Sequence, residues 1–382
     1  MVSKKLRAAV AALVLSAAAA AAVLASTATA EAAARPQVGN PLKQAIALAN
    51  SGNTSAAEAK LRDAESVGGL TAGDNQAIAQ VKAFVAAKNG NSSTGAKAKF
   101  ANDYNAGRYS AVVGDDVQLL RKYGAYDYES QVVVAQAYYQ MGRCEQAIPM
   151  LRDLSSGSRA SEAVLSVMYS AAYKCGDNEA MRSALERLVQ SYNKPQYWSD
   201  LLQAAEGAKG LKDHQLLDIY RLRVLTNSLK TADDYETSAE LAIEFHSAAE
   251  AQNIVQKGLD AKVLSGARDM RLLDTAKAQA AADTAALPKT IAAANVAKTG
   301  DAEVSLGETY WGMGRYQDAI NAIQAALKKG VTDRDDAEVR LGTAYFGAGQ
   351  KPAALSAFGA VSRNNANEAL IAHIWTLYAH TH

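Results

Sequence analysis

The sequence of 382 residues is poor in proline, cysteine and most aromatic residues. It contains 6 Pro, 2 Cys, 5 Phe and 3 Trp, against 17 Tyr. Short alternating runs of Val, Ile and Thr between Asn-Gly turns, which are typical of strands, are nearly absent. Proline interrupts helices, whereas alanine, which is plentiful here, has the highest helix propensity. The composition therefore predicts an all-α fold.

Motifs for catalysis and nucleotide binding are also missing. The sequence has no Gly-x-Ser-x-Gly, no Walker-type loop and no dinucleotide fingerprint. It therefore predicts no catalytic residue and no cofactor, and a protein that is not an enzyme. No histidine forms the i, i+4 pair beside a glutamate that zinc peptidases use, so no metal site is predicted. The histidines are His214, His246, His373, His380 and His382, of which the last two fit either a weak metal-binding pair or a frayed end.

The first 30 residues have the composition of a secretory signal. Three basic residues within the first seven precede the apolar run 8–25, and Ala28-Thr29-Ala30 forms a small-x-small cleavage site. This pattern predicts a signal peptide cut after Ala30 and a periplasmic or secreted protein, with no membrane span after cleavage. The alternative is an uncleaved anchor, because the apolar run is about long enough to cross a bilayer.

The charge of the predicted mature chain is close to zero. Residues 1–30 carry three basic and no acidic residues, so cleavage leaves 37 Lys and Arg against 39 Asp and Glu. A near-neutral chain lacks the electrostatic footprint of a nucleic-acid-binding protein, and it lacks the polybasic segments that bind membranes.

Residues 301–361 contain one pattern twice, 35 residues apart. A self-match at this period is typical of stacked helical hairpins. The glycine permits the left-handed conformation at which the first helix ends, and the small residue five places later allows close approach of the second helix. The two copies read Leu306-Gly307, Tyr310-Trp311, Gly314, Ala319, Ile323, Ala326 and Leu341-Gly342, Tyr345-Phe346, Gly349, Ala354, Phe358, Val361.

Weaker copies lie around Tyr138-Tyr139 with Gly142 and around Tyr173 with Gly176. Together, these residues resemble the tetratricopeptide repeat family. Its helix-turn-helix units of 34 residues carry Leu-Gly, Tyr, Gly, Ala, Phe or Ile, and Ala at the same relative positions. The resemblance implies an α-solenoid, a right-handed superhelix of hairpins with a concave peptide-binding face. The expected organisation is signal peptide 1–30, degenerate hairpins 31–127, a repeat pair 128–192, degenerate repeats 193–299, two clear repeats 300–364 and a capping helix 365–382.

Two residues of the degenerate region 193–299 depart from the repeat pattern. In the degenerate region, His246 stands where a repeat would have glycine, and Pro288 is expected to break the helical pattern between 267–282 and 291–297. At the C-terminus, Trp375 and Tyr378 would cover the apolar end of the stack, which argues against end-to-end filaments. The sequence does not fix the oligomeric state.

The resemblance implies a non-enzymatic scaffold that binds a protein or peptide partner on its concave face. An alternative is an accessory or catalytic component of cell-wall or polymer metabolism that uses the repeats as a platform. A catalytic domain would then have to lie in the irregular segment 193–287. Tyr139, Trp311 and Phe346 each directly follow the repeat tyrosine. Their side chains either anchor a peptide in the groove or pack between neighbouring repeats. Transfer of the family's groove-facing positions gives the candidate binding residues Gln136, Tyr139, Glu308, Trp311, Arg340, Thr343 and Phe346.

The two cysteines, Cys144 and Cys175, are expected to form a disulfide. An even pair in an exported chain is first interpreted as a bridge. Cys144 starts the second helix of one hairpin and Cys175 ends the first helix of the next, and antiparallel stacking places these ends side by side. Two free buried thiols or a redox pair are the alternatives, although the sequence has no Cys-x-x-Cys.

Overall fold

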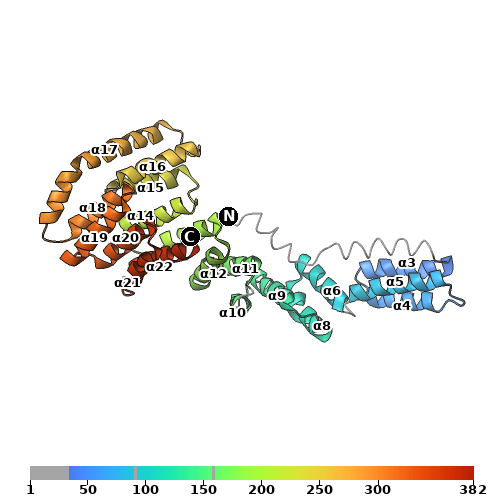
Figure 1. Cartoon of the computed structure of the whole chain (residues 1–382). Helices are drawn as coiled ribbons and strands as arrows, with labels where there is room; N and C mark the ends of the chain where they lie inside the picture. Colours follow the sequence, from blue (N-terminus) through green and yellow to red (C-terminus); the bar gives the residue numbers. More distant parts are fainter. Residues whose placement is uncertain (1–33, 90–92, 157–159) are drawn as a thin grey trace. The chain divides into compact units, whose positions relative to one another are not determined.

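A computed structural model describes residues 34–89, 93–156 and 160–382, and all regular structure in these ranges is helical. The predicted signal peptide lies outside them. The chain divides into two compact units, residues 1–184 and 185–382, whose elements Figure 1 colours along the sequence. Within the described ranges, no helix has the length and apolar character needed to cross a membrane. The prediction of an all-α solenoid of hairpins is confirmed.

The first unit begins with a three-helix bundle. Its helices are α3 (Pro36–Asn50), α4 (Thr54–Glu65) and α5 (Ala72–Asn89), and their apolar faces share one core that includes Leu42, Leu61 and Val81. Capping fixes where two of the helices begin, because the Asn53 and Asp74 side chains accept hydrogen bonds from the backbone of Ala56 and Thr71.

The rest of the first unit continues with shorter elements and two hairpins. A kinked segment comprises α6 (Ser93–Asn105), α7 (Tyr109–Ala111), the π-helical turn η1 (Val112–Asp116) and α8 (Val117–Lys122). The hairpins follow as α9 (Tyr128–Gln140) with α10 (Cys144–Ser155), and α11 (Glu162–Cys175) with α12 (Asn178–Tyr192). Gly142 and Gly176 end the first helices with φ of 73° and 70°, the left-handed conformation that the repeat pattern predicts.

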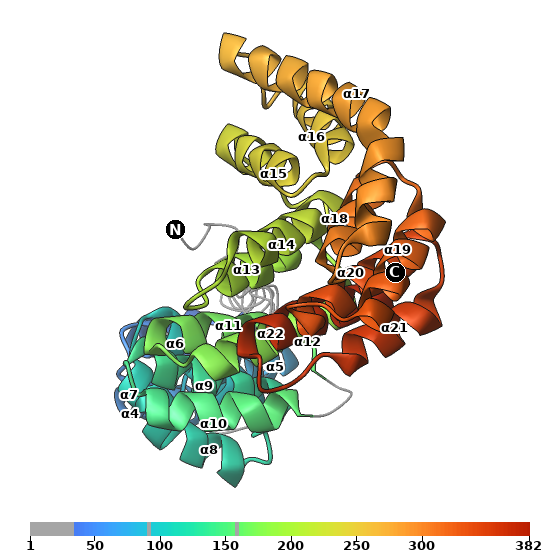
Figure 2. The same cartoon turned by 90° about the vertical axis from the view of Figure 1, so that its left-hand side faces the viewer.

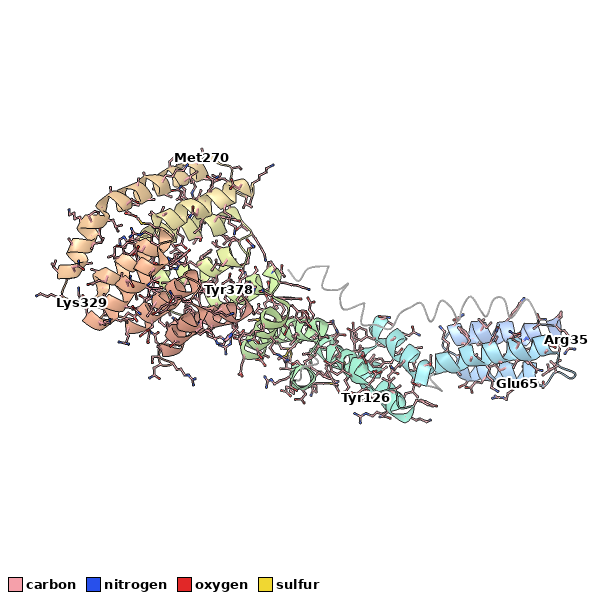
Figure 3. The ribbon with its side chains drawn as sticks, viewed as in Figure 1. Arg35, Glu65, Tyr126, Met270, Lys329 and Tyr378 are labelled. Carbon is pink, nitrogen blue, oxygen red and sulfur yellow. A yellow bond between two sulfur atoms is a disulfide. The ribbon has the colours of Figure 1, made fainter. Side chains whose placement is uncertain are left out.

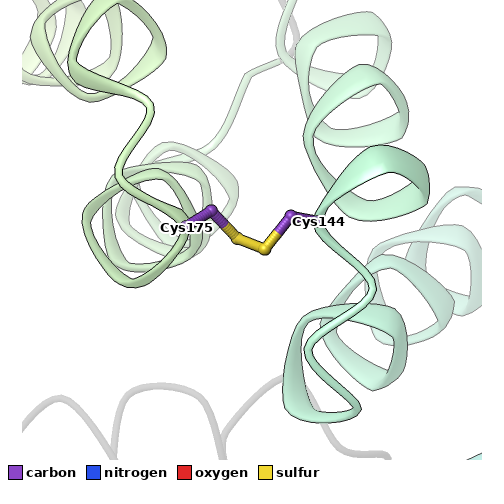
Figure 4. Close-up of a disulfide and its surroundings, with 2 residues drawn as sticks. All are labelled: Cys144 and Cys175. Atoms are coloured by element: carbon purple, nitrogen blue, oxygen red, sulfur yellow. A yellow bond between two sulfur atoms is a disulfide. The ribbon is translucent and has the colours of Figure 1, made fainter.

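A disulfide joins the two hairpins of the first unit. Cys144 at the start of α10 is bonded to Cys175 at the end of α11, with their Cα atoms 5.8 Å apart (Figure 4). The predicted pairing is confirmed, and the structure describes no free cysteine. The bond links consecutive hairpins, because antiparallel stacking places these two helix ends together.

Reduction of this disulfide should lower stability. The bond spans 31 residues in sequence, and on the chain-entropy model such a loop contributes about 3–4 kcal/mol. We expect the urea midpoint of the purified chain to fall in reductant, and to be insensitive to reductant in the Cys144→Ser/Cys175→Ser variant. Alkylation of two thiols per chain before any reduction would contradict the bridge.

The second unit begins at Leu185, within α12, and continues with α13 to α22. Three pairs form hairpins, namely α15 with α16, α18 with α19, and α20 with α21. His246 closes the first of them with φ of 61°, so a non-glycine residue takes the left-handed position of the repeat glycine. The bounds are α13 (Pro195–Glu206), α14 (Asp213–Leu225), α15 (Ala232–Glu244), α16 (Ala248–Asp260), α17 (Ala267–Val296), α18 (Asp301–Gly312), α19 (Tyr316–Lys329), α20 (Arg334–Gly347), α21 (Lys351–Ala360) and α22 (Ala366–Thr381).

The expected helix break at Pro288 is wrong. Helix α17 runs for 30 residues through Pro288, and Figures 1 and 2 show it as one continuous, curved helix that passes α16. Two separate cores anchor its halves, with Leu273 packed among α14–α16 and Leu287 among α18–α20. Tertiary packing and an alanine-rich sequence therefore offset the loss of the hydrogen bond that proline cannot donate.

The C-terminal helix returns to the start of its own unit. Helix α22 packs against α20 and α21 and also against α14 (Figure 2). The Tyr378 ring lies 5.7 Å from that of Trp198 on α13, and Figure 3 labels Tyr378 in this region. The side chains of Trp375 and Tyr378 are therefore buried between α22 and the helices that it packs against. Contacts run in a closed circuit from α14 through α15, α16, α18, α20 and α22 back to α14.

The repeat glycines at helix crossings should not tolerate a methyl group. A Cβ at Gly307 would overlap Ile323, and one at Gly342 would overlap the Phe358 ring. We expect Gly307→Ala and Gly342→Ala each to lose about 1–3 kcal/mol in chemical denaturation, because overpacking displaces neighbours. Gly359→Ala is the matched control, since no atom lies within 4 Å of that position, and equal losses in all three variants would contradict the packing argument.

Candidate functional site

A buried network of charged side chains occupies the centre of the second unit. Arg221 of α14 is fully buried, and its Nη2 lies 2.9 Å from Glu250 Oε2 of α16 and 2.6 Å from Glu308 Oε2 of α18. The other oxygen of Glu308 lies 2.6 Å from Arg340 Nη1 of α20. The Glu308 carboxylate thus joins two arginines, and the pairs tie four helices together.

The network extends to the C-terminal helix through a histidine. Arg340 Nε donates to both oxygens of Asp336 at 2.9 Å. His214 Nε2 lies 3.5 Å from Asp336 Oδ1 and 3.0 Å from Glu368 Oε1 on α22. Gln215 Nε2 also donates to Glu368 Oε1, at 2.7 Å. These contacts hold α14, α20 and α22 against one another at the point where the circuit closes.

Burial and ion pairing shift the pKa values of the network in opposite directions. Burial raises the pKa of Asp218 to about 7, and Arg221 only partly offsets this. Burial would also raise the pKa of Glu308, but the charges of Arg221 and Arg340 outweigh it and lower that pKa to about 2. For His214, burial lowers the pKa, whereas Glu368 and Asp336 raise it by more. Glu308 is therefore ionised over the whole range in which proteins are studied.

Two cavities adjoin this network. The smaller has a volume of about 240 Å³ and the larger about 400 Å³. Network residues line both of them, with Glu308 and Arg340 in the smaller and Arg221 and Glu250 in the larger. The other lining residues are His214, Phe245, His246, Asp301, Val304, Ser305, Thr332, Asp333 and Asp336 in the smaller, and Val224, Leu225, Ala249, Gln252, Asn253, Ile254, Lys257, Trp311, Gly312, Met313, Gly314 and Tyr316 in the larger.

Four of the seven candidate binding residues are almost completely buried. Gln136, Glu308, Arg340 and Thr343 are 1–4% exposed. Glu308 and Arg340 are engaged by other helices of the same unit, and the Thr343 hydroxyl donates to the Arg340 carbonyl oxygen. A partner could reach these four side chains only after local rearrangement, so their role in binding stays a prediction.

The three aromatic candidates are half-buried and contact neighbouring side chains. The Trp311 ring stacks on the Arg221 guanidinium, with 4.1 Å between its centroid and Cζ. Phe346 lies 5.3 Å from the Tyr378 ring on α22, and Lys174 Nζ lies 4.8 Å from the Tyr139 ring. Trp311 is the one of the three aromatics that also lines one of these two cavities.

Sequence reasoning missed most of the network. Asp218 and Arg221 come from the irregular region, and the residues that they meet are far away in sequence. A signal was nevertheless present, because both interrupt the largely apolar stretch Leu216–Leu225 of a helix. Charged residues within an apolar helix face indicate buried partners.

Removal of Arg221 should be strongly destabilising. The Arg221→Met variant leaves the Glu250 and Glu308 carboxylates buried without their shared partner, and we expect a loss of about 3–5 kcal/mol in the free energy of unfolding. The Lys82→Met variant is the control, because this exposed lysine pairs with the exposed Glu65 at the surface and should cost under about 1 kcal/mol. Similar losses in the two variants would contradict the central role of the network.

The raised pKa of Asp218 predicts a pH dependence of stability. The folded chain keeps this proton up to about pH 7, whereas the unfolded chain releases it near the ordinary value of 3.8. The contribution of Asp218 to stability therefore falls as pH rises between these values, by at most about 1.4 kcal/mol per pH unit. The stability of Asp218→Asn relative to wild type should rise from pH 4 to 7 and level off above. Parallel curves in urea denaturation would rule this out.

Comparison with known proteins finds one family model that matches a short segment of the chain. Residues 304–328, which include Glu308 and Trp311, match a family model described as "Tetratricopeptide repeat". A search of curated proteins found no match.

Solved repeat-protein structures show a distant likeness. A tetratricopeptide repeat protein from Parabacteroides merdae ATCC 43184 is 12% identical with a TM-score of 0.28, over 67% of this chain and 99% of that one. The pentatricopeptide repeat protein PPR10 from maize is 13% identical with a TM-score of 0.29, over 96% of this chain and 66% of that one. The match at 304–328 shows that this segment is similar to one tetratricopeptide repeat.

Proposed function

We propose that the chain is an exported, non-enzymatic scaffold that binds an extended segment of a partner protein. The observation that carries this proposal is the cavity of about 400 Å³ beside Trp311, because that tryptophan belongs to the matched repeat 304–328. Tetratricopeptide repeats generally serve protein interaction, and a cavity of this size accommodates one or two large side chains.

The lining of this cavity suits an apolar anchor. Trp311, Met313 and Ile254 provide apolar surface, and Leu225 at the mouth is 40% exposed. An exposed leucine beside an aromatic cavity is a typical site for a buried hot-spot side chain. Gln252 and Asn253 lie at the same cavity, where their amides can bond to the backbone of an extended peptide.

The closed network favours this site over the remaining predicted groove positions. Contact with Glu308, Arg340 or Thr343 would require the partner to separate helices that buried ion pairs hold together. Breaking such pairs without replacement costs several kcal/mol. We therefore assign the partner to the larger cavity and its rim, with Trp311 retained as a candidate binding residue.

Export is part of the proposal. The signal-like pattern of residues 1–30 supports it, and so does the Cys144–Cys175 disulfide, because structural disulfides persist in oxidising compartments. We infer a location in the periplasm or outside the cell.

Selection of binding peptides tests the assignment. Random 12-residue peptides displayed on phage are selected on the purified mature chain, and synthetic copies are titrated by fluorescence anisotropy. We expect selected sequences to share a large apolar residue, and Leu225→Glu to weaken their binding at least about 10-fold, because a carboxylate would enter the anchor site.

Met270→Glu is the matched control. Met270 on α17 is 47% exposed and does not line the cavity, so its substitution should leave peptide binding unchanged. Thermal melting of both variants checks that the fold is intact. Peptides that bind Leu225→Glu as tightly as wild type would remove the cavity as the partner site.

A further inference from the structure

We propose that His214, Asp336 and Glu368 form a binding site for a divalent transition-metal cation, with Zn²⁺ as the best fit. One ligand atom from each residue lies within 4.8 Å of the others, and the three residues come from α14, α20 and α22. The site is separate from the proposed partner cavity, whose lining includes none of the three.

The spacing of the ligand atoms matches a metal site before any metal binds. Zinc bound at about 2.0–2.2 Å in tetrahedral geometry holds its ligand atoms about 3.4 Å apart. His214 Nε2 lies 3.0 Å from Glu368 Oε1 and 3.5 Å from Asp336 Oδ1. Two of the three separations are thus already close to that of a zinc site, and the third is within 4.8 Å. On binding, Nε2 gives up the proton that it shares with Glu368 and offers its lone pair to the metal.

An unsatisfied buried oxygen is a second, independent sign of a missing ligand. The Glu368 side chain is fully buried, and its Oε2 has no hydrogen-bond partner. A buried carboxylate oxygen without a partner is unfavourable, and a cation would satisfy it. The other oxygen of Glu368 accepts from Gln215, and Asp336 accepts from Arg340. Such outer contacts orient ligands in known metal sites.

The net negative charge of the surrounding network also favours the binding of a cation. The buried network holds more carboxylates than permanent cations, so Arg221 and Arg340 cannot balance it. A divalent cation beside Asp336 and Glu368 would offset most of the excess. The carboxylates counted here are Glu250, Glu308, Asp336 and Glu368, because Asp218 keeps its proton up to about pH 7 as its pKa is raised by burial.

The smaller cavity provides the entry path. His214 and Asp336 line its wall, together with three further carboxylates, Asp301, Glu308 and Asp333. Its volume of about 240 Å³ admits several waters, which can fill the coordination positions that the three protein ligands leave open. A metal there would clamp α22 to α14 and α20 and so hold the helical circuit closed.

Zinc titration of the chelator-treated mature chain tests this proposal. Isothermal titration calorimetry with ZnCl₂ should show one site per chain, and Co²⁺ should give the visible absorption of a low-symmetry site. We expect His214→Gln to weaken Zn²⁺ binding at least about 100-fold. Saturating Zn²⁺ should raise the melting temperature of wild type and not of this variant, because the metal binds only the folded chain.

Two controls separate this site from the other histidines. His373→Ala removes a histidine of α22 that pairs with Glu186 outside the cluster, and deletion of 380–382 removes the terminal His-x-His pair. Both should bind Zn²⁺ as wild type does. If His214→Gln fails to fold by circular dichroism, Glu368→Gln provides the same comparison. Absence of binding at 10-fold molar excess of Zn²⁺, or loss of the site on deletion of 380–382, would overturn the proposal.

Discussion

The second unit depends on one carboxylate held between two arginines. Glu308 contacts Arg221 on one side and Arg340 on the other, at 2.6 Å in each case. The three residues lie on different helices and are buried, so the pairs act in a medium of low dielectric constant where loss of one partner is costly. Because they meet only when α14, α18 and α20 are correctly placed, the network specifies the arrangement of helices more than it adds to net stability.

Closure of the circuit explains the burial of the inner helix faces. In an open solenoid, these faces would meet solvent or a ligand. Here α22 packs against α14, and the ring contact of Tyr378 with Trp198 seals the junction. Trp311 and Phe346 consequently pack against Arg221 and Tyr378. Two cavities lie at the edge of the network, and their linings differ: one is acidic beside His214, and the other is largely apolar beside Leu225.

The sequence was informative where the structure depends on local rules. The period of 35 residues, the helix-stop glycines and the positions of Cys144 and Cys175 all follow from helix geometry, and the hairpins and the disulfide could be predicted from them. The continuity of α17 through Pro288 could not, because two separate cores hold its halves. The return of α22 and the meeting of His214 with Glu368, 154 residues away, depend on the summed curvature of many hairpins. No local pattern encodes that sum.

The positions that the family resemblance assigns to a binding groove have a structural role in this chain. Resemblance to tetratricopeptide repeats implies that Glu308 and Arg340 face a ligand, and the structure shows both side chains buried. Their partners, however, are Arg221, Asp336 and one another, all from the same chain. A charged inner face that would remain exposed in an open array must be neutralised once the array closes, because an unpaired buried charge is unfavourable. Side chains of the chain itself therefore fill the positions of Glu308 and Arg340, which is why we propose the cavity beside Leu225 and Trp311 as the partner site.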